Sequence, residues 1–465
     1  MSAREEQSGR HPVDEILPAG RLAGLGLQHV MVMYASAVAV PFIVGAGLNL
    51  PPEDIAYLVT ADLLLCGIGT LLQSLGIWKI GIRLPMVMGA AYTSVTPMIL
   101  IGNDYGLQTA YGAVLFAGIG MFIMSWGFTK LLRFFPPVVT GSVITVIGLS
   151  LMPAGVRLVV GSDPAAPDYA ALDKVALGAV TLLIVVVFYR FLPALFRQFA
   201  ILLSLVAATI VALIFGMANF EGITEGAVVA VPEPFYFGFP EFNLAASFTM
   251  LLVVMVLSVE CIGQSKAVGE AVERAVSDDQ IGGAIRADAS TTMLASVFQV
   301  FPYTTFAQNI GVITLTGVRS RYVTVASGII LILLGLFPPM GRIVAAIPQP
   351  VLGAVAMAMF ALVAVSGMRI LSTVNFNRTS NLVIVAISVG LGLIPTAAPD
   401  FYTNFPPDAQ LFLRSGVAMG TVSAVLLNLL FNHVRWLFSE PLTEEVTASG
   451  IAEGVPRSPA VDAED

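Results

Sequence analysis

The sequence predicts an all-α polytopic membrane protein, and three observations lead to that fold class. Of its 465 residues, 57% are hydrophobic and 11% are charged, whereas soluble domains carry about 25% charged residues. Fourteen apolar segments are each long enough, or nearly so, to cross the hydrocarbon core of a bilayer. An internal repeat relates the first seven segments to the last seven. We therefore predict fourteen transmembrane segments, arranged as two inverted seven-helix repeats.

The apolar segments lie near residues 24–46, 55–76, 85–102, 108–129, 137–156, 175–195, 199–218, 246–265, 283–300, 303–316, 322–341, 348–367, 380–396 and 412–436. The third and the tenth are short and contain Gly, Pro, Thr and Ser, which favours interrupted spans. A count of twelve spans, with these two segments re-entrant, is the alternative. The two cysteines both fall inside apolar segments, so no disulfide framework is expected.

The distribution of basic residues supports fourteen spans with both termini in the cytoplasm. In that topology all but four of the 22 Lys and Arg residues lie on the cytoplasmic side, as the positive-inside rule requires. The exceptions are Arg157, Lys174, Arg342 and Arg414. If the third and tenth segments were re-entrant, basic loops would no longer alternate with loops poor in Lys and Arg. Residues 1–21 are polar and carry Arg4, Arg10 and Arg21 before the first apolar run, so no cleavable signal peptide is expected.

The repeat is visible in two pairs of segments. Asp62 and Gln73 in the second segment have the same spacing as Asp288 and Gln299 in the ninth. The third and tenth segments share similar triplets, Tyr92-Thr93-Ser94 and Tyr303-Thr304-Thr305. Both pairs are seven segments apart, so the two halves have opposite orientations. Inverted repeats with paired interrupted segments indicate the binding site of a secondary transporter.

Ionisable side chains at membrane depth cost about 3 kcal/mol or more, so each is a functional candidate. Glu260 lies late in an apolar helix, where its carboxylate can accept hydrogen bonds from a ligand or hold a proton. A structural partner on another helix is the alternative role. Two roles are equally plausible for His29: a proton relay, or a structural residue that hydrogen-bonds a neighbouring helix. We favour a function for Asp288, in the same half as Glu260, and a structural role for Asp62.

The tenth segment begins with β-branched and aromatic residues after Pro302, and it contains Gly311. These residues disfavour an unbroken helix, so extended backbone is expected to line a cavity there. Such backbone offers free N–H and C=O groups to a planar heterocycle. Gln308 adds an amide with donor and acceptor atoms, and Tyr92 in the third segment adds a stacking face.

The run Gln308-Asn309-Ile310-Gly311-Val312-Ile313-Thr314-Leu315-Thr316-Gly317 resembles the signature of the nucleobase–ascorbate transporters, also called the nucleobase–cation symporter-2 family. The resemblance extends over nearly the whole chain. It implies short β-strands in the two interrupted segments, a core domain and a gate domain, an elevator-like motion and a homodimer. The implied core is 22–135 and 246–341, and the implied gate is 136–245 and 342–437. Residues 1–21 and 438–465 are expected to be cytoplasmic tails, the second disordered.

The resemblance also implies roles for individual residues. Glu260 matches the substrate-binding glutamate, and glutamine at Gln308 is similar to xanthine and urate carriers, whereas uracil carriers usually have glutamate. Tyr92 and Ala307 match positions whose backbone amides face the substrate. Phe306, next to Ala307, is a further candidate substrate-binding residue. Asn309, His29 and Asp288 match polar positions tied to affinity or coupling. Gln264 departs from the family pattern of aspartate or histidine, and because it cannot titrate, it leaves the coupling ion open.

These features predict a proton-coupled importer of xanthine or urate in the bacterial inner membrane. We expect membrane lipid, protons, the nucleobase and a second copy of the chain as partners, and no nucleic acid, cofactor or metal. A uracil carrier and a sodium-coupled purine carrier are the alternatives. An anion or sulfate permease would need a basic site, yet no Lys or Arg falls in the two interrupted segments. A channel or a membrane enzyme is disfavoured, because one glutamate is no catalytic set and a channel needs no inverted repeat.

Overall fold

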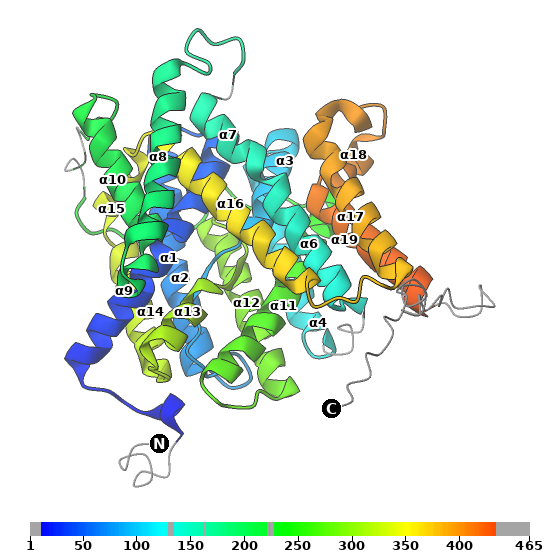
Figure 1. The fold of residues 1–465 in the computed structure, drawn as a ribbon, viewed down its shortest axis with the longest axis horizontal. Coiled ribbons are helices and arrows are strands. Elements are labelled where there is room, and N and C mark those ends of the chain that lie inside the picture. The colour runs from blue at the N-terminus through cyan, green and yellow to red at the C-terminus, as the bar shows by residue number, and fades with distance from the viewer. Residues whose placement is uncertain (1–10, 129–133, 162, 221–222, 224–226, 434–465) are drawn as a thin grey trace, which may run out of the picture.

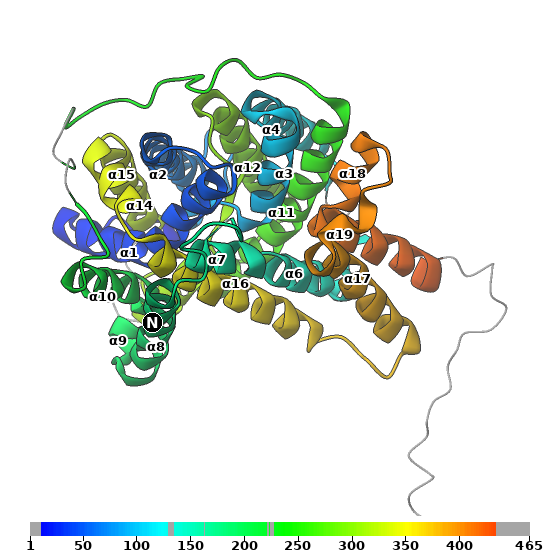
Figure 2. The ribbon, with the colours of Figure 1, turned by 90° about the horizontal axis from the view of Figure 1, so that it is seen from above.

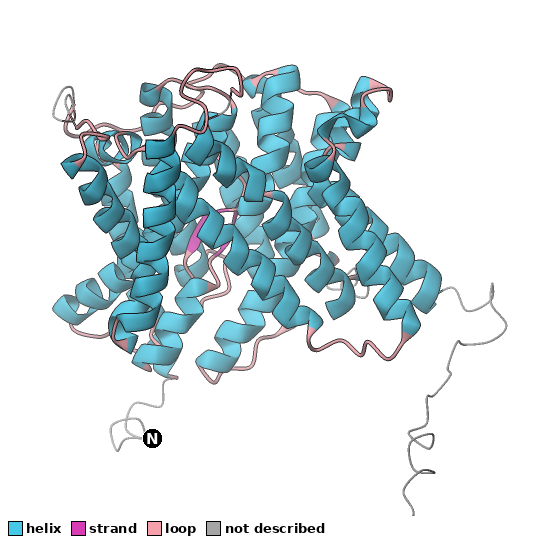
Figure 3. Cartoon of the chain, turned by 45° about the horizontal axis from the view of Figure 1, so that its top comes forward, coloured by secondary structure: helices cyan, strands magenta, loops and turns pink. Residues whose placement is uncertain are grey.

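The computed structural model describes residues 11–128, 134–161, 163–220, 223 and 227–433. In this part of the chain, helices surround one short two-stranded sheet at the centre of the protein (Figures 1 and 3). The expected C-terminal tail and the first ten residues of the N-terminal tail lie outside it.

The elements follow one another in the order of the predicted segments. The first half contains η1 (Pro12–Asp14), α1 (Ala19–Gly47), α2 (Pro52–Leu75), β1 (Met88–Ala90), η2 (Tyr92–Ser94), α3 (Val95–Tyr105), α4 (Leu107–Met124), α6 (Pro137–Ser150), α7 (Met152–Val160), α8 (Leu172–Phe191), α9 (Ala194–Arg197) and α10 (Ala200–Ile214). The second half contains α11 (Leu244–Ala271), α12 (Asp278–Phe298), β2 (Tyr303–Thr305), α13 (Gln308–Thr316), α14 (Arg321–Gly335), α15 (Pro338–Ala345), α16 (Gln349–Leu371), α17 (Thr379–Ala397), η4 (Pro399–Tyr402), α18 (Pro407–Leu413), α19 (Gly416–Asn428) and η5 (Leu429–His433).

Every predicted segment corresponds to at least one helix, and the third and tenth each correspond to a strand followed by a helix. Among the described residues, eight helices are long and apolar enough to cross a membrane by length and composition, or ten if two bent pairs are counted. The bends are 79° between α14 and α15 and 76° between α18 and α19. The protein is thus a multi-pass membrane protein, and the count of fourteen crossings stays a prediction.

The predicted short strands in the two interrupted segments are confirmed. β1 and β2 pair antiparallel, with Gly89 opposite Thr304. The hydroxyl of Thr70 in α2 accepts the N–H of Met88 at 3.0 Å, and that of Thr292 in α12 accepts the N–H of Tyr303 at 3.1 Å. These bonds satisfy strand N–H groups that a two-stranded sheet would otherwise leave unpaired inside the protein.

The two interrupted segments differ in how their helices begin. The strands pair with Ala90 opposite Tyr303. In the first repeat the 3₁₀ turn η2 (Tyr92–Ser94) leads directly into α3, whereas in the second repeat Phe306 and Ala307 separate β2 from α13. The similar triplets Tyr92-Thr93-Ser94 and Tyr303-Thr304-Thr305 therefore adopt different structures, a 3₁₀ turn in one repeat and a strand in the other.

The helices pack in two groups (Figures 1 and 2). In one, α2 packs on α14 and α15, α4 packs on α11 and α12, and α1 packs on α2 and α14. In the other, α16 packs on α6, α7 and α8, while α17 and α19 pack on each other and on α6. The sheet is attached to the first group, because β1 contacts α2 and β2 contacts α11 and α12.

Close glycine contacts join α2 to α14. A Cβ on Gly67 would lie 2.5 Å from the carbonyl oxygen of Gly328, and a Cβ on Gly328 would lie 3.0 Å from that of Gly67. Small residues allow this backbone approach between membrane helices. We expect Gly67→Ala to lower the stability of the purified protein by about 1–3 kcal/mol, measured as a lower melting temperature in detergent.

The matched control is Gly390→Ala on α17, where a Cβ would meet no described atom within 4 Å. An unchanged melting temperature for Gly67→Ala would contradict the packing described for α2 and α14.

Candidate functional site

Two helices begin beside the sheet, close to the middle of the protein (Figure 3). α3 follows β1 and η2, and α13 follows β2. Neither Ser94 nor Ala307, the N-cap residues, makes a side-chain capping bond. Helix N-termini carry unpaired N–H groups and a partial positive charge. Each interrupted segment therefore presents a polar helix end beside the sheet.

Backbone donors are available at both ends. The N–H groups of Tyr92, Thr93, Ala307 and Gln308 donate to no acceptor in the described part of the chain. Unpaired N–H groups at such depth need a partner, which can be a ligand or water. The arrangement suits a flat molecule with carbonyl oxygens on two of its edges.

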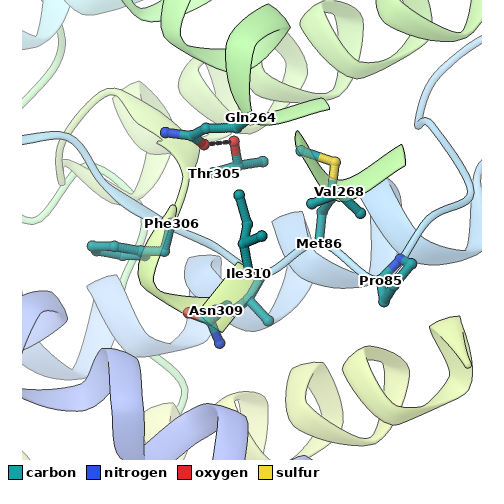
Figure 4. Close-up of a pocket in the computed structure, with 9 residues that line it drawn as sticks. Pro85, Met86, Gln264, Val268, Thr305, Phe306, Asn309 and Ile310 are labelled. Carbon is teal, nitrogen blue, oxygen red and sulfur yellow. Dashed lines mark hydrogen bonds between the residues drawn. The ribbon is translucent and has the colours of Figure 1, made fainter. Parts of the chain in front are cut away.

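Helix α11 lies against both interrupted segments. Glu260 and Gln264 are one turn apart on it, so they face the same side. The Thr93 side chain interacts with the half-buried Glu260 carboxylate. The Thr305 hydroxyl donates to the amide oxygen of Gln264 (Figure 4). One face of α11 thus binds the first interrupted segment through a carboxylate and the second through an amide.

Asp288 belongs to a buried polar network next to Glu260. Gln73 Nε2 donates to Asp288 Oδ1 at 2.7 Å and to the carbonyl oxygen of Ala284 at 2.9 Å. The Thr304 hydroxyl donates to Asp288 Oδ2 at 3.4 Å. These contacts join α12 to α2 and β2, so Asp288 is both a brace between the two repeats and an electrostatic neighbour of Glu260.

Asp62 makes a reciprocal contact from the first repeat. The Tyr303 hydroxyl donates to Asp62 Oδ1 at 2.5 Å, and the Cys66 thiol lies 3.5 Å from Asp62 Oδ2. Each repeat-related aspartate therefore binds a strand residue, Tyr303 or Thr304, and both contacts fix β2.

His29 and Asn309 are in direct contact. Asn309 Nδ2 lies 3.0 Å from His29 Nδ1 and 3.1 Å from the His29 carbonyl oxygen, and both residues are buried. The contact attaches α13 to α1. In this conformation the histidine holds the start of α13, as expected for a strut, while Asn309 Oδ1 accepts no hydrogen bond from the described residues.

The remaining candidates differ in exposure. Ala307 and Gln308 are exposed, and the Gln308 side chain makes no hydrogen bond to a described residue. Tyr92 is buried: its hydroxyl donates to the Ser36 carbonyl oxygen at 3.0 Å, and its ring packs edge-on against Phe360 at 5.5 Å. The Tyr92 ring therefore contacts α1 and α16, and its unpaired N–H is the group that remains available.

A narrow crevice lies beside these residues (Figure 4). It is lined by Pro85, Met86, Val87, Gln264, Val268, Thr305, Phe306, Asn309 and Ile310. The structure therefore brings Gln264, Phe306 and Asn309 together, whereas Glu260, Gln308 and Tyr92 lie outside the crevice lining. The sequence interpretation missed Thr93 and Thr305 as partners of the α11 side chains, since hydroxyl residues are common in this chain.

Comparison with known proteins identifies the family. A family model described as a permease family matches residues 20–401. The chain belongs to this permease family. Its relatives include the xanthine permease of Bacillus subtilis (strain 168), 40% identical over 89% of this chain and 94% of the relative. Another is the uric acid transporter UacT of Escherichia coli (strain K12), 41% identical over 90% of this chain and 88% of the relative.

Membership confirms the resemblance carried by the Gln308–Gly317 motif, and it makes this permease a transporter and not an enzyme. Solved structures show the same fold. The transmembrane domain of the cyanobacterial bicarbonate transporter BicA aligns with a TM-score of 0.53 at 13% identity, covering 89% of this chain and 98% of that domain. SLC26A9 aligns with a TM-score of 0.57 at 15% identity, covering 88% of this chain and 65% of that protein.

Proposed function

We propose that this permease imports a purine nucleobase, xanthine or urate, by proton symport across the bacterial inner membrane. The observation that carries the proposal is the identity of about 40% over nearly 90% of the chain with transporters named for xanthine and for uric acid. The charge distribution supports an orientation with both termini in the cytoplasm.

In the proposed site, the purine lies between the ends of α3 and α13. Glu260 accepts ring N–H groups, and the unpaired N–H groups of Tyr92 and Ala307 donate to oxo groups of the substrate. The Gln308 amide hydrogen-bonds an adjacent C=O and N–H pair of the purine, since the amide has both a donor and an acceptor. The Phe306 ring, whose backbone N–H is bonded to the Val87 carbonyl oxygen at 2.9 Å, packs against the heterocycle.

Glu260 is also the proposed proton carrier, with Asp288 as its electrostatic neighbour. Two carboxyl groups that interact strongly titrate as a pair. Gln264 cannot titrate, and its amide is bonded to Thr305, so it supports β2 and takes no proton. His29 and Asn309 support the start of α13.

Alternating access is proposed to follow an elevator motion of a core against a gate. The packing of the described helices in two groups supports a core of residues 22–135 and 246–341 and a gate of residues 136–245 and 342–437. The substrate would move with the core because Glu260, Ala307 and Gln308 all belong to it. A homodimer formed by the gate would hold the gate still in the membrane.

Competition separates the candidate substrates. We expect excess unlabelled xanthine or urate to block uptake of labelled xanthine into cells that express the chain, and excess uracil to leave it unchanged. If uracil alone inhibited the uptake of labelled xanthine, the chain would be a pyrimidine carrier and the proposal would be wrong.

Gln308→Glu tests whether the Gln308 amide hydrogen-bonds the substrate. The substitution replaces an amide donor by a carboxylate that only accepts, so it leaves a purine C=O without its partner. An unsatisfied polar group of this kind costs about 1–3 kcal/mol, so we expect the concentration for half-maximal xanthine uptake to rise at least about five-fold. Asn377→Asp, in the connection before α17, is the matched amide-to-acid control. An unchanged uptake profile for Gln308→Glu would remove Gln308 from the site.

A further inference from the structure

An exposed aromatic and basic surface lies outside the candidate site. It consists of Trp78 and Lys79, between α2 and β1, and Trp126, just after α4; we call it the tryptophan patch. The buried Arg286 of α12 packs against Trp126. The Trp78 side chain is 77% exposed and that of Trp126 is 52% exposed. Their rings lie edge-to-face, with centroids 6.5 Å apart.

The protein holds this patch in a fixed position. Ile77 and Ile80 form a β-bridge around Trp78 and Lys79, and Trp78 has a φ of 51°, which is unusual for a bulky residue. Arg286 Nε donates to the Lys79 carbonyl oxygen at 2.6 Å. The chain therefore accepts an unfavourable backbone conformation that directs a large indole outward.

The patch exposes the positive charge of Lys79, whereas the buried Arg286 lies 3.9 Å from Asp279 Oδ1. Lys79 Nζ lies 5.8 Å from the Trp78 ring centroid and 5.3 Å from that of Trp126, and Arg286 Cζ lies 4.3 Å from the Trp126 centroid. Lys79 forms no ion pair with a described residue. An anionic partner is thus the one that matches the charge.

The neighbouring face of α4 indicates where the partner lies. Ile119 and Ile123 are exposed on the side of α4 that leads to Trp126, because positions four and three residues apart share a helix face. The surface therefore changes from aliphatic to aromatic to basic along one line. Membrane proteins have this order where hydrocarbon meets the lipid headgroups.

We propose that the tryptophan patch binds the headgroup of an anionic phospholipid in the cytoplasmic leaflet. The Lys79 ammonium contacts the lipid phosphate, and the two indoles lie at the level where headgroups meet acyl chains. The site belongs to the helix group that holds the sheet, so it would associate this lipid with the part of the protein that carries the substrate.

Tryptophan fluorescence tests the proposal directly, because the chain has three tryptophans. In a Trp436→Phe background, emission comes from Trp78 and Trp126 alone. The full chain is reconstituted in nanodiscs of phosphatidylcholine and phosphatidylglycerol, with bromine quenchers on the acyl chains of one lipid or the other. One basic residue contributes about 1 kcal/mol of attraction, so we expect brominated phosphatidylglycerol to be enriched about five-fold beside the indoles.

Lys79→Gln is expected to remove this preference while leaving quenching by brominated phosphatidylcholine unchanged. Arg21→Gln, which removes a basic residue in the first turn of α1, is the matched control and should keep it. Equal quenching by the two brominated lipids in the parent protein would overturn the proposal. Loss of the preference on addition of inorganic phosphate at constant ionic strength would also overturn it, in favour of a soluble anion.

Discussion

Replacing Glu260 by glutamine is expected to abolish accumulation of the purine while the protein still folds and inserts. The amide cannot hold an exchangeable proton, and it loses the charge that strengthens hydrogen bonds to ligand N–H groups. Hydrogen bonds to a charged group contribute about 1.5–3 kcal/mol each, so losing two lowers affinity by about a hundred-fold or more. Uptake of labelled xanthine into cells, and binding of xanthine to purified protein, measure the two effects.

Glu270→Gln is the matched control, since Glu270 is an exposed carboxylate on the same helix. It should transport like the parent protein. A Glu260→Gln protein that accumulates xanthine normally would remove this residue from both substrate binding and proton coupling.

Gly89→Ala is expected to reduce uptake at least ten-fold by displacing the ring of Phe306. A Cβ on Gly89 would lie 1.8 Å from Phe306 Cε2 and 2.6 Å from Cδ2. The Phe306 backbone is bonded to the Val87 carbonyl oxygen at 2.9 Å, so the ring must turn away instead. Overpacking of this kind costs about 1–3 kcal/mol, which a lower melting temperature would report along with the loss of uptake.

A double-mutant cycle isolates the cause. In a Phe306→Leu background the ring is absent, so Gly89→Ala should lower the melting temperature much less than it does in the parent protein. Gly311→Ala, in the neighbouring helix α13, meets no described atom within 4 Å and is the matched control. An equal destabilisation in both backgrounds would mean that the ring is not what excludes a side chain at position 89.

Much of the fold could be predicted from the sequence because hydrocarbon imposes simple constraints. Charge is excluded from spanning segments, so the apolar runs located the helices. Pro302, Gly311 and the β-branched residues between them indicated a break, and the β1–β2 pair lies there. The number of true crossings was harder to predict, because α12 carries Arg286 and Asp288 and the bend between α14 and α15 divides one predicted segment.

The site was predictable in its residue types and less so in its connections. A carboxylate inside an apolar helix made Glu260 a candidate, but no pattern indicated that Thr93 interacts with it or that Thr305 donates to Gln264. Such partners depend on how α11 packs against the two interrupted segments, which is tertiary information. The repeated triplets show the same limit, because Tyr92-Thr93-Ser94 forms a 3₁₀ turn and Tyr303-Thr304-Thr305 forms a strand.

Proton-driven purine transport in reconstituted liposomes tests the central claim most directly. The purified chain is placed in sodium-free vesicles, and labelled xanthine or urate is added with an acidic exterior, an equal pH on both sides, or an inward sodium gradient. Protein-free vesicles correct for passive entry of these weak acids. The proposal predicts protein-dependent accumulation with the acidic exterior alone. Accumulation driven only by sodium, or no protein-dependent uptake of either purine, would contradict it.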